Sequence, residues 1–246
     1  MTIRVGVGGW TYEPWRGVFY PEGLAQKREL EYAAQQLTAI EINATYYGRQ
    51  KPQSWRNWAA AVPEGFVFSL KASRYCTQRK VLAESGNSIR MFLDQGFTQL
   101  GPKLGPINWQ LADGKTFDRE DFARFLDLIP DTQDGVPLRH ALEVRHESFA
   151  DPAFLDLARA RNMAVVFADD DEFPRIKEQT ADFTYARLQR SVEEIETGYD
   201  TAGLDHWAEQ ARAWAKGGRD VFVYFISGAK VRNPAAAQAL IARLKA

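Results

Sequence analysis

The sequence predicts an α/β protein built as a single (β/α)8 barrel, the TIM-barrel fold, and three observations support this. The first is length, because 246 residues match the roughly 250 that this fold typically needs. The second is that short β-branched or apolar runs alternate with helical patterns along the chain, as in repeated βαβ units. The third is that the glycine fingerprint of the alternative, a doubly wound nucleotide-binding sheet, is missing. We therefore expect one domain spanning residues 1–246.

The expected strands are short and evenly distributed, and a helical segment follows each of them. Their residue ranges are 3–8, 39–44, 66–71, 106–111, 141–145, 163–168, 183–188 and 221–226. Asp151-Pro152 and Asn233-Pro234 each predict a helix start, with a capping side chain before a proline in the first turn. The helices after the second and sixth strands have the weakest signals.

Composition and charge exclude several classes of protein. With 45% hydrophobic and 26% charged residues, the chain is neither disordered nor fibrous. Its 31 lysines and arginines balance 32 aspartates and glutamates, so net charge does not indicate nucleic-acid or membrane binding. One cysteine permits no internal disulfide and suits a reducing compartment. We see no signal peptide and no uncharged stretch approaching the ~20 residues of a membrane span, so we expect a cytoplasmic protein.

Polar residues interrupt several strands that a parallel barrel should keep apolar. Both faces of such strands are buried, yet Glu41 alternates with isoleucines, and Glu143 alternates with Leu142 and Val144. If the apolar partners face the helices, the polar residues point into the barrel near its C-terminal mouth, where active sites of this fold lie. The predicted set is Glu41, Asn43, Lys71, Gln110, Glu143, Arg145, Asp169, Arg187 and Tyr224.

Buried charges of both signs must pair with one another or bind a ligand, because a lone buried ion costs several kcal/mol. One interpretation is a structural salt-bridge network. The other is a site for a small polar or anionic ligand, since lysine and arginine suit phosphate and carboxylate groups. In that case we expect Lys71, Arg145 and Arg187 to bind the anion. Carboxylates among mixed charges are candidates for acid–base catalysis, and these are Glu41, Glu143 and Asp169.

Aromatic residues, 13% of the chain, gather in the expected loops after the first two strands. Trp10, Tyr12 and Tyr46 are further candidates for substrate binding, because aromatic rings at a barrel mouth can stack on bases or sugar faces. The alternative is that these rings only pack against the protein. Trp55 and Trp58, at helical spacing, fit the core better.

The sequence also bears on whether the site uses a metal ion or a covalent intermediate. Three histidines are too few for a histidine-rich multi-zinc site, and no cofactor is expected, although carboxylates would allow Mg²⁺ or Mn²⁺. Lys71 has the position of a Schiff-base lysine, but nothing in the sequence marks a lowered pKa.

Three classes of function therefore remain open. The first is an enzyme for a small polar substrate bearing phosphate or carboxylate, such as a sugar phosphate, a nucleotide or a nucleic-acid end. The second is a non-catalytic module that binds nucleic acid or glycan through the aromatic loops. The third is a glycoside hydrolase that uses Glu41 and Glu143. The sequence does not set the oligomeric state.

The sequence also resembles the YecE-like family, known as domain of unknown function 72. The resemblance begins with the motifs at residues 8–12, 15–21 and 41–47. It continues through Trp58, Pro63, residues 66–71, Gln110, residues 143–145, Asp169, Tyr185 and Arg187. It implies a TIM barrel and no established activity. The chain departs from the family pattern at Gln78, Ala112-Asp113, Gln189-Arg190 and Ile226-Ser227, which leaves an altered ligand open.

Overall fold

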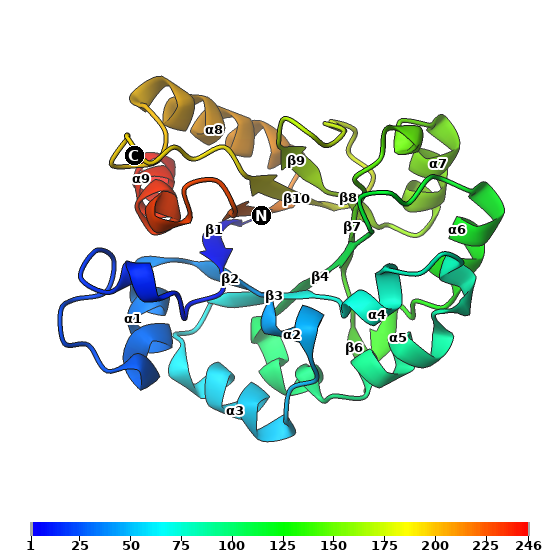
Figure 1. Cartoon of the computed structure of the whole chain (residues 1–246), viewed down its shortest axis with the longest axis horizontal. Coiled ribbons are helices and arrows are strands. Elements are labelled where there is room, and N and C mark those ends of the chain that lie inside the picture. The colour runs from blue at the N-terminus through cyan, green and yellow to red at the C-terminus, as the bar shows by residue number, and fades with distance from the viewer. Residues whose placement is uncertain (1, 246) are drawn as a thin grey trace.

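The strands form one parallel sheet that curls into a nearly closed barrel, with helices on the outside (Figure 1). The structure is a computed structural model that describes residues 2–245. Within that range the sheet order is β8-β7-β4-β3-β2-β1-β11-β10-β9. The strands are β1 (Ile3–Gly8), β2 (Ala39–Ile42), β3 (Val67–Lys71), β4 (Leu104–Gln110), β7 (His140–Glu143), β8 (Ala164–Val165), β9 (Phe167–Asp169), β10 (Phe183–Leu188) and β11 (Asp220–Phe225).

The barrel closes through β8 and β9, which are two parts of the expected sixth strand. β8 pairs with β7, and β9 pairs with β10, while Val166 between them donates to the Leu142 carbonyl at 3.0 Å. The two ends of the sheet are thus one continuous segment of chain. The predicted barrel is confirmed, and the ninth strand arises only because its sixth strand is split.

The helices surround the sheet and follow the strands in the expected alternation, except after β9 (Figure 1). They are α1 (Glu29–Gln36), α2 (Ala44–Tyr47), α3 (Pro52–Ala61), α4 (Arg74–Thr77), α5 (Gly86–Leu93), α6 (Arg119–Asp127), α7 (Pro152–Ala160), α8 (Thr201–Trp214) and α9 (Asn233–Lys245). Asp151 caps α7 as predicted, since its carboxylate accepts from the Ala153 amide at 2.8 Å. No helix in the part of the chain described here is long and apolar enough to cross a membrane.

Two local predictions were wrong, and one further element was not predicted. Asn233 does not cap α9, because a 3-10 turn, Lys230–Arg232, precedes it and its side chain instead bonds Ser191 and the Ser227 carbonyl. Residues 170–182, after β9, form no helix; an acidic run there meets Pro174, which disfavours a continuous helix. A short antiparallel hairpin, β5 (Thr132–Gln133) with β6 (Val136–Pro137), precedes β7. Its Asp134-Gly135 turn has positive φ angles of 50° and 76°, the geometry that Asp-Gly favours.

Alternation along the strands separates two cores. Ile40, Ile42 and Leu142 belong to the large core that includes buried helix residues such as Leu30 and Phe125. Their strand neighbours form a smaller cluster inside the barrel, comprising Ala39, Val67, Ala141, Ala164, Val166, Phe183, Tyr185, Phe222, Tyr224 and Ile226. This second cluster fills the lower barrel with apolar groups, so the polar residues two positions further along each strand lie above it, towards the mouth.

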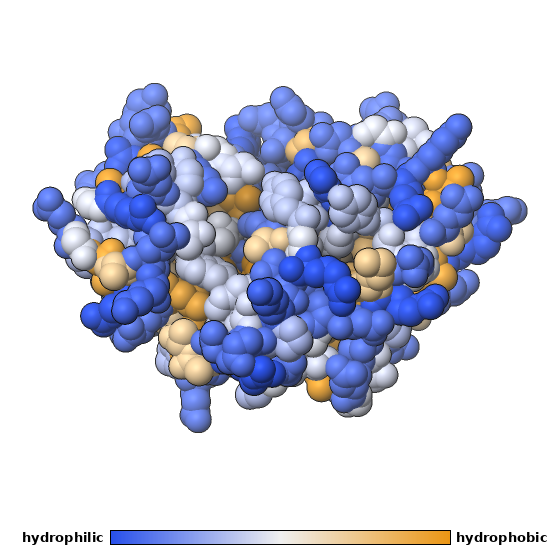
Figure 2. Space-filling view, turned by 60° about the horizontal axis from the view of Figure 1, so that its bottom comes forward, coloured by the Kyte–Doolittle hydropathy of each residue, from blue (hydrophilic) through white to orange (hydrophobic). Residues whose placement is uncertain are grey.

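At Gly6 in β1, a Cβ atom would lie 1.9 Å from the Ala39 carbonyl oxygen, so only glycine permits this close approach of β1 and β2. The face drawn in Figure 2 is mainly hydrophilic, with hydrophobic residues in small separate spots. That face therefore offers no broad apolar surface among the described residues.

Candidate functional site

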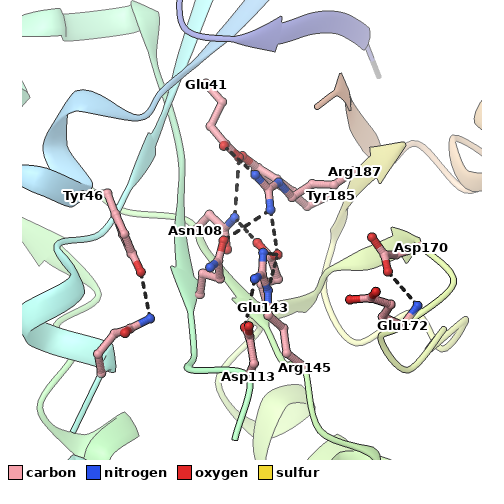
Figure 3. A network of polar contacts seen from close by, with 12 residues as sticks. Glu41, Tyr46, Asn108, Asp113, Glu143, Arg145, Asp170, Glu172, Tyr185 and Arg187 are labelled. Carbon is pink, nitrogen blue, oxygen red and sulfur yellow. Dashed lines mark hydrogen bonds and ion pairs between the residues drawn. The ribbon is translucent and has the colours of Figure 1, made fainter. Parts of the chain in front are cut away.

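Arg187, from β10, lies at the centre of a buried polar network that joins four strands (Figure 3). Its Nη1 donates to Glu143 Oε1 at 2.6 Å and its Nη2 to Glu41 Oε1 at 3.2 Å. Asn108 Nδ2, from β4, donates to Glu143 Oε2 at 2.7 Å and lies 3.5 Å from Glu41 Oε2. Arg187 Nη1 also lies 3.4 Å from Gln110 Oε1. The structure thus brings Glu41, Gln110, Glu143 and Arg187 together, as the strand alternation predicts.

The network holds Glu143 and Arg187 in their ionised forms. Burial alone would raise the pKa of Glu143, but Arg187, Arg145, Lys71 and the Asn108 amide outweigh it and bring that pKa to about 2. Burial likewise disfavours the charged Arg187, yet Glu143 and Glu41 raise its pKa above the ordinary value. A buried ion pair survives only when such partners compensate for lost hydration.

Two tyrosines complete the interior of this network. Tyr185 donates its hydroxyl to Glu41 Oε2 at 2.5 Å, and burial followed by the Glu41 charge raises its pKa well above the ordinary value. Tyr224 shares a 2.6 Å hydrogen bond with Ser69 and is fully buried. Tyr224, expected to bind substrate, therefore lies inside the barrel and has a protein partner already.

Arg145 extends the network to the surface of the mouth. Its Nη2 lies 3.2 Å from Glu143 Oε1, and its Nη1 lies 2.9 Å from Asp113 Oδ1. The guanidinium also lies over the Phe173 ring, 4.4 Å from its centre. The side chain of Arg145 is 16% exposed and that of Asp113 is 67% exposed. Solvent weakens the Asp113 contact accordingly, so Arg145, unlike the buried Arg187, can reach a ligand.

Lys71, the last residue of β3, differs from the other cations of the mouth. Its Nζ lies 4.4 Å from the centre of the Tyr46 ring, and no carboxylate within residues 2–245 lies in salt-bridge contact with it. Burial, followed by the repulsion of Arg187, lowers the pKa of Lys71 to about 8. Glu143 and Glu41 act in the opposite direction without restoring the ordinary value.

Asp169, the third predicted catalytic carboxylate, lies apart from this network. It pairs with Arg175 at 2.8 Å and, more loosely, with Arg190 at 3.9 Å. Burial raises the pKa of Asp169 although both arginines oppose the change. Around residues 2–245, no group of three or more histidine, cysteine, aspartate or glutamate side chains forms a metal-binding cluster. The expectation of no cofactor, with Mg²⁺ or Mn²⁺ allowed by the carboxylates, stays a prediction.

The predicted aromatic residues divide between two places. Trp10, Tyr12 and Asn43 line a cavity of about 510 Å³ next to β1 and β2, together with Trp58 and Lys230. Trp10 packs edge-on against Trp58 at 5.2 Å between ring centres. Tyr46 lies elsewhere, under Lys71, and its hydroxyl accepts from Gln78 Nε2 at 2.7 Å. Gln78 is one of the positions that depart from the family pattern.

Three residues of the network escaped the sequence analysis, namely Asn108, Tyr185 as a partner of Glu41, and Asp113 as a partner of Arg145. A period of two could have revealed the first two, since Asn108 precedes Gln110 by two positions and Tyr185 precedes Arg187 by two. Nothing in the sequence marks Asp113, because its contact depends on the path of a loop.

The sequence also matches a known family along nearly its full length. Residues 4–246 align with the family described as "Protein of unknown function DUF72". The chain belongs to this family. The resemblance to YecE-like proteins is thereby confirmed, since that name is another label for the same family. No curated protein matches the chain.

Solved structures of DUF72 proteins show the same fold. A DUF72 family protein from Thermotoga maritima MSB8 is 22% identical, with a TM-score of 0.79 and 100% of both chains covered. A second from Enterococcus faecalis V583 is 19% identical, with a TM-score of 0.77, and the match covers 100% of this chain and 98% of that one. A xylose isomerase-like TIM barrel/4-hydroxyphenylpyruvate dioxygenase fusion protein is 12% identical, with a TM-score of 0.52, covering 96% of this chain and 42% of the other. At these identities the likeness concerns the barrel alone.

Proposed function

We propose that this DUF72 protein is an enzyme that acts on a small polar anionic substrate at the C-terminal mouth of the barrel. The substrate class is a phosphate- or carboxylate-bearing sugar, a nucleotide or a nucleic-acid end. One observation carries the proposal: Lys71 lies at the mouth without a carboxylate partner among residues 2–245, whereas Arg187 and Arg145 are paired.

The charges of the mouth support an anionic ligand. Glu41 and Glu143 are the two buried carboxylates that contact Arg187, and Lys71, Arg145 and Arg187 are the three cations around them. Asp113 is largely exposed, so water screens much of its charge. One positive charge is therefore left without a buried counterpart, and a phosphate or carboxylate group would balance it.

Two polar atoms of the network also lack a protein partner. Arg187 Nε and Asn108 Oδ1 are buried and make no hydrogen bond to any described residue. Buried polar groups are rarely left in this condition. A fully satisfied salt-bridge network would contain no such atoms, so they favour a ligand site over a purely structural network.

The proposal gives different roles to the two arginines and two glutamates. Arg187 and Glu143 form the rigid bottom of the site, and Glu143 orients Arg145 towards the ligand. With a pKa of about 2, Glu143 is ionised at neutral pH and donates no proton. Lys71 and Arg145 bind the anion. Glu41 is the carboxylate of the proposal that transfers protons, alongside Tyr185.

The glycoside hydrolase alternative has less support. Catalytic carboxylates of those enzymes lie on either side of the scissile bond, yet Arg187 and Asn108 side chains already bridge Glu41 and Glu143. The binding-module alternative has one specific observation in its favour, the aromatic cavity lined by Trp10, Tyr12 and Trp58. A planar ring fits such walls.

Titration calorimetry with inorganic phosphate and with pyrophosphate tests the proposed site. We expect binding to the wild-type protein, and a loss of about tenfold or more in Lys71→Ala and in Arg145→Ala, because each removes a charge-assisted hydrogen bond. The exposed Lys80 supplies the matched control, Lys80→Ala, which should bind like wild type. A phosphatase, nuclease and glycosidase screen then looks for turnover. Equal binding by all four proteins would overturn the site, and binding of glycans or oligonucleotides without turnover would favour the module.

A further inference from the structure

The Lys71 amine has surroundings that an anion-binding lysine does not require. It lies at the end of β3, mostly shielded from water, with one face of Tyr46 4.4 Å from Nζ. In register with it across the sheet is Asn108 of the buried network. A ring face attracts an ammonium group only weakly compared with a carboxylate. The amine of Lys71 thus lies in the mouth without a contacting carboxylate among the described residues, the partner that would keep it protonated.

The nearby carboxylates are committed to other groups. Glu143 receives hydrogen bonds from Arg187, Arg145 and Asn108. Glu41 receives them from Arg187 and Tyr185. The two arginines instead lie close enough to repel a charged Lys71. Burial and like charge both favour the neutral amine, which is the form that carries a lone pair.

The degree of neutralisation suits a nucleophile. With a pKa of about 8, roughly a tenth of the Lys71 side chains are neutral at pH 7, compared with fewer than about one in a thousand for an ordinary lysine. The same side chain remains largely cationic, so it can attract an anionic substrate before it reacts. Arg145, 16% exposed at the rim, is available to hold the anionic group.

We infer that Lys71 is a nucleophile that forms an imine with the carbonyl group of an aldehyde or ketone whose phosphate or carboxylate is held by Arg145. This inference rests on the proposed function and narrows its substrate to an anionic carbonyl compound. The carbon–oxygen double bond is what distinguishes this class from phosphate esters that carry no carbonyl.

The reaction balances without any further reagent. The Nζ lone pair attacks the carbonyl carbon, so that a C–N bond forms and the carbonyl π electrons move to oxygen, giving a carbinolamine after proton transfer from nitrogen. The oxygen then takes up a proton and leaves as water while the C=N bond forms. Amine and carbonyl compound give imine and water, and nothing is oxidised or reduced.

Trapping with pyridoxal 5′-phosphate tests this inference, because that probe carries an aldehyde and a phosphate on one small molecule. The intact protein is mixed with less than one equivalent of the probe over a range of pH and reduced with borohydride. The adduct is then located by peptide mass mapping. We expect most of the adduct on Lys71, with a yield that rises through a midpoint near pH 8. Arg145→Ala should lower the Lys71 yield about tenfold at limiting probe.

Lys71→Arg and Lys80→Arg are the matched variants, since both keep the charge and remove one amine. Lys71→Arg should lose the main adduct, whereas Lys80→Arg should behave like wild type. Adducts spread over exposed lysines with none on Lys71 of the wild type would overturn the inference. Because Lys71→Arg keeps a cation at the mouth, retained phosphate binding by this variant without wild-type trapping at Lys71 would leave the anion site standing and refute only the imine. Loss of both would remove the proposed function as well.

Discussion

The deep network of the barrel mouth and Lys71, in the outer part of the mouth, differ in whether their charges are paired. In the deep part, Arg187 has two carboxylates within 3.2 Å, and every charged group has a partner of opposite sign. At the outer part, Lys71 has a tyrosine ring and no carboxylate partner within the described chain. The residues of both parts are polar groups at the ends of barrel strands, so polarity alone does not distinguish them. They differ in whether a partner of opposite charge lies in contact.

The difference teaches which group is stabilised and which is reactive. The paired, buried carboxylate of Glu143 keeps a fixed ionisation state, as its pKa of about 2 indicates. The unpaired amine of Lys71 shifts towards its neutral form, as its pKa of about 8 indicates. Reactive groups are commonly found among side chains perturbed in this second way. We therefore expect substitutions in the deep network and at Lys71 to change the free energy of unfolding in opposite directions.

Breaking the deep network should have the largest effect. Glu143→Ala would leave Arg187 buried with only part of its compensation, and removing one partner of a buried ion pair typically costs about 3–5 kcal/mol. We expect the free energy of unfolding, measured with urea, to fall by that amount. Glu143→Ala combined with Arg187→Met should recover part of the loss. A loss below about 1 kcal/mol in the single variant would show that the pairing contributes little.

Lowering the pH should reduce the free energy of unfolding in two steps, through His140 first and then through Glu143. The pKa of His140 is lowered from 6.5 to about 4 by burial, so the unfolded chain binds a proton first and stability falls between these values. The pKa of Glu143 lies at about 2 in the folded protein against 4.5 ordinarily, so its contribution, about 3 kcal/mol, is present above pH 4.5 and lost on the way to pH 2.

Urea unfolding followed at steps of pH checks both acid effects. His140→Gln should flatten the upper part of the profile, between about pH 6.5 and 4, and leave the lower part unchanged. Glu143→Gln should do the reverse. A wild-type stability that stays constant from pH 7 to pH 3 would contradict both assignments.

Substitution of Lys71, in the outer part, should change the free energy of unfolding by a smaller amount and in the opposite direction. Lys71→Met removes an amine whose charged form is disfavoured in the folded protein, by about 3 kcal/mol for this shift. The variant also loses the contact of the ammonium with the Tyr46 ring, so we expect a net gain of about 1–2 kcal/mol in unfolding free energy at pH 7. The gain should be complete below pH 8 and vanish above 10.5, because the folded-state pKa is about 8 and the ordinary value is 10.5. Lys80→Met, at an exposed position, should show no such pH dependence.

The sequence predicted the barrel and the interior position of Glu41, Glu143 and Arg187, because a period of two fixes which face of a strand a residue occupies. It could not predict the pairing, which depends on side-chain directions across different strands. Asp169 has the same strand-end position as Lys71, yet it pairs with Arg175 from the coil after β9. The lowered pKa of Lys71 arises from burial and from two arginines distant in sequence, which no local pattern records.

The most direct test of this account is an NMR titration of the Lys71 amine in the intact protein, with Lys71→Arg used to assign its resonance. We expect the amine to titrate with a midpoint near pH 8, shifted from the ordinary 10.5 by burial and by Arg187. Arg187 itself is part of the buried network, so Arg145→Ala is the better second sample, and it should raise the midpoint by removing a like charge. A wild-type midpoint at 10.5 or above would mean that Lys71 is an ordinary paired or hydrated lysine, and would contradict the contrast between the two parts of the mouth.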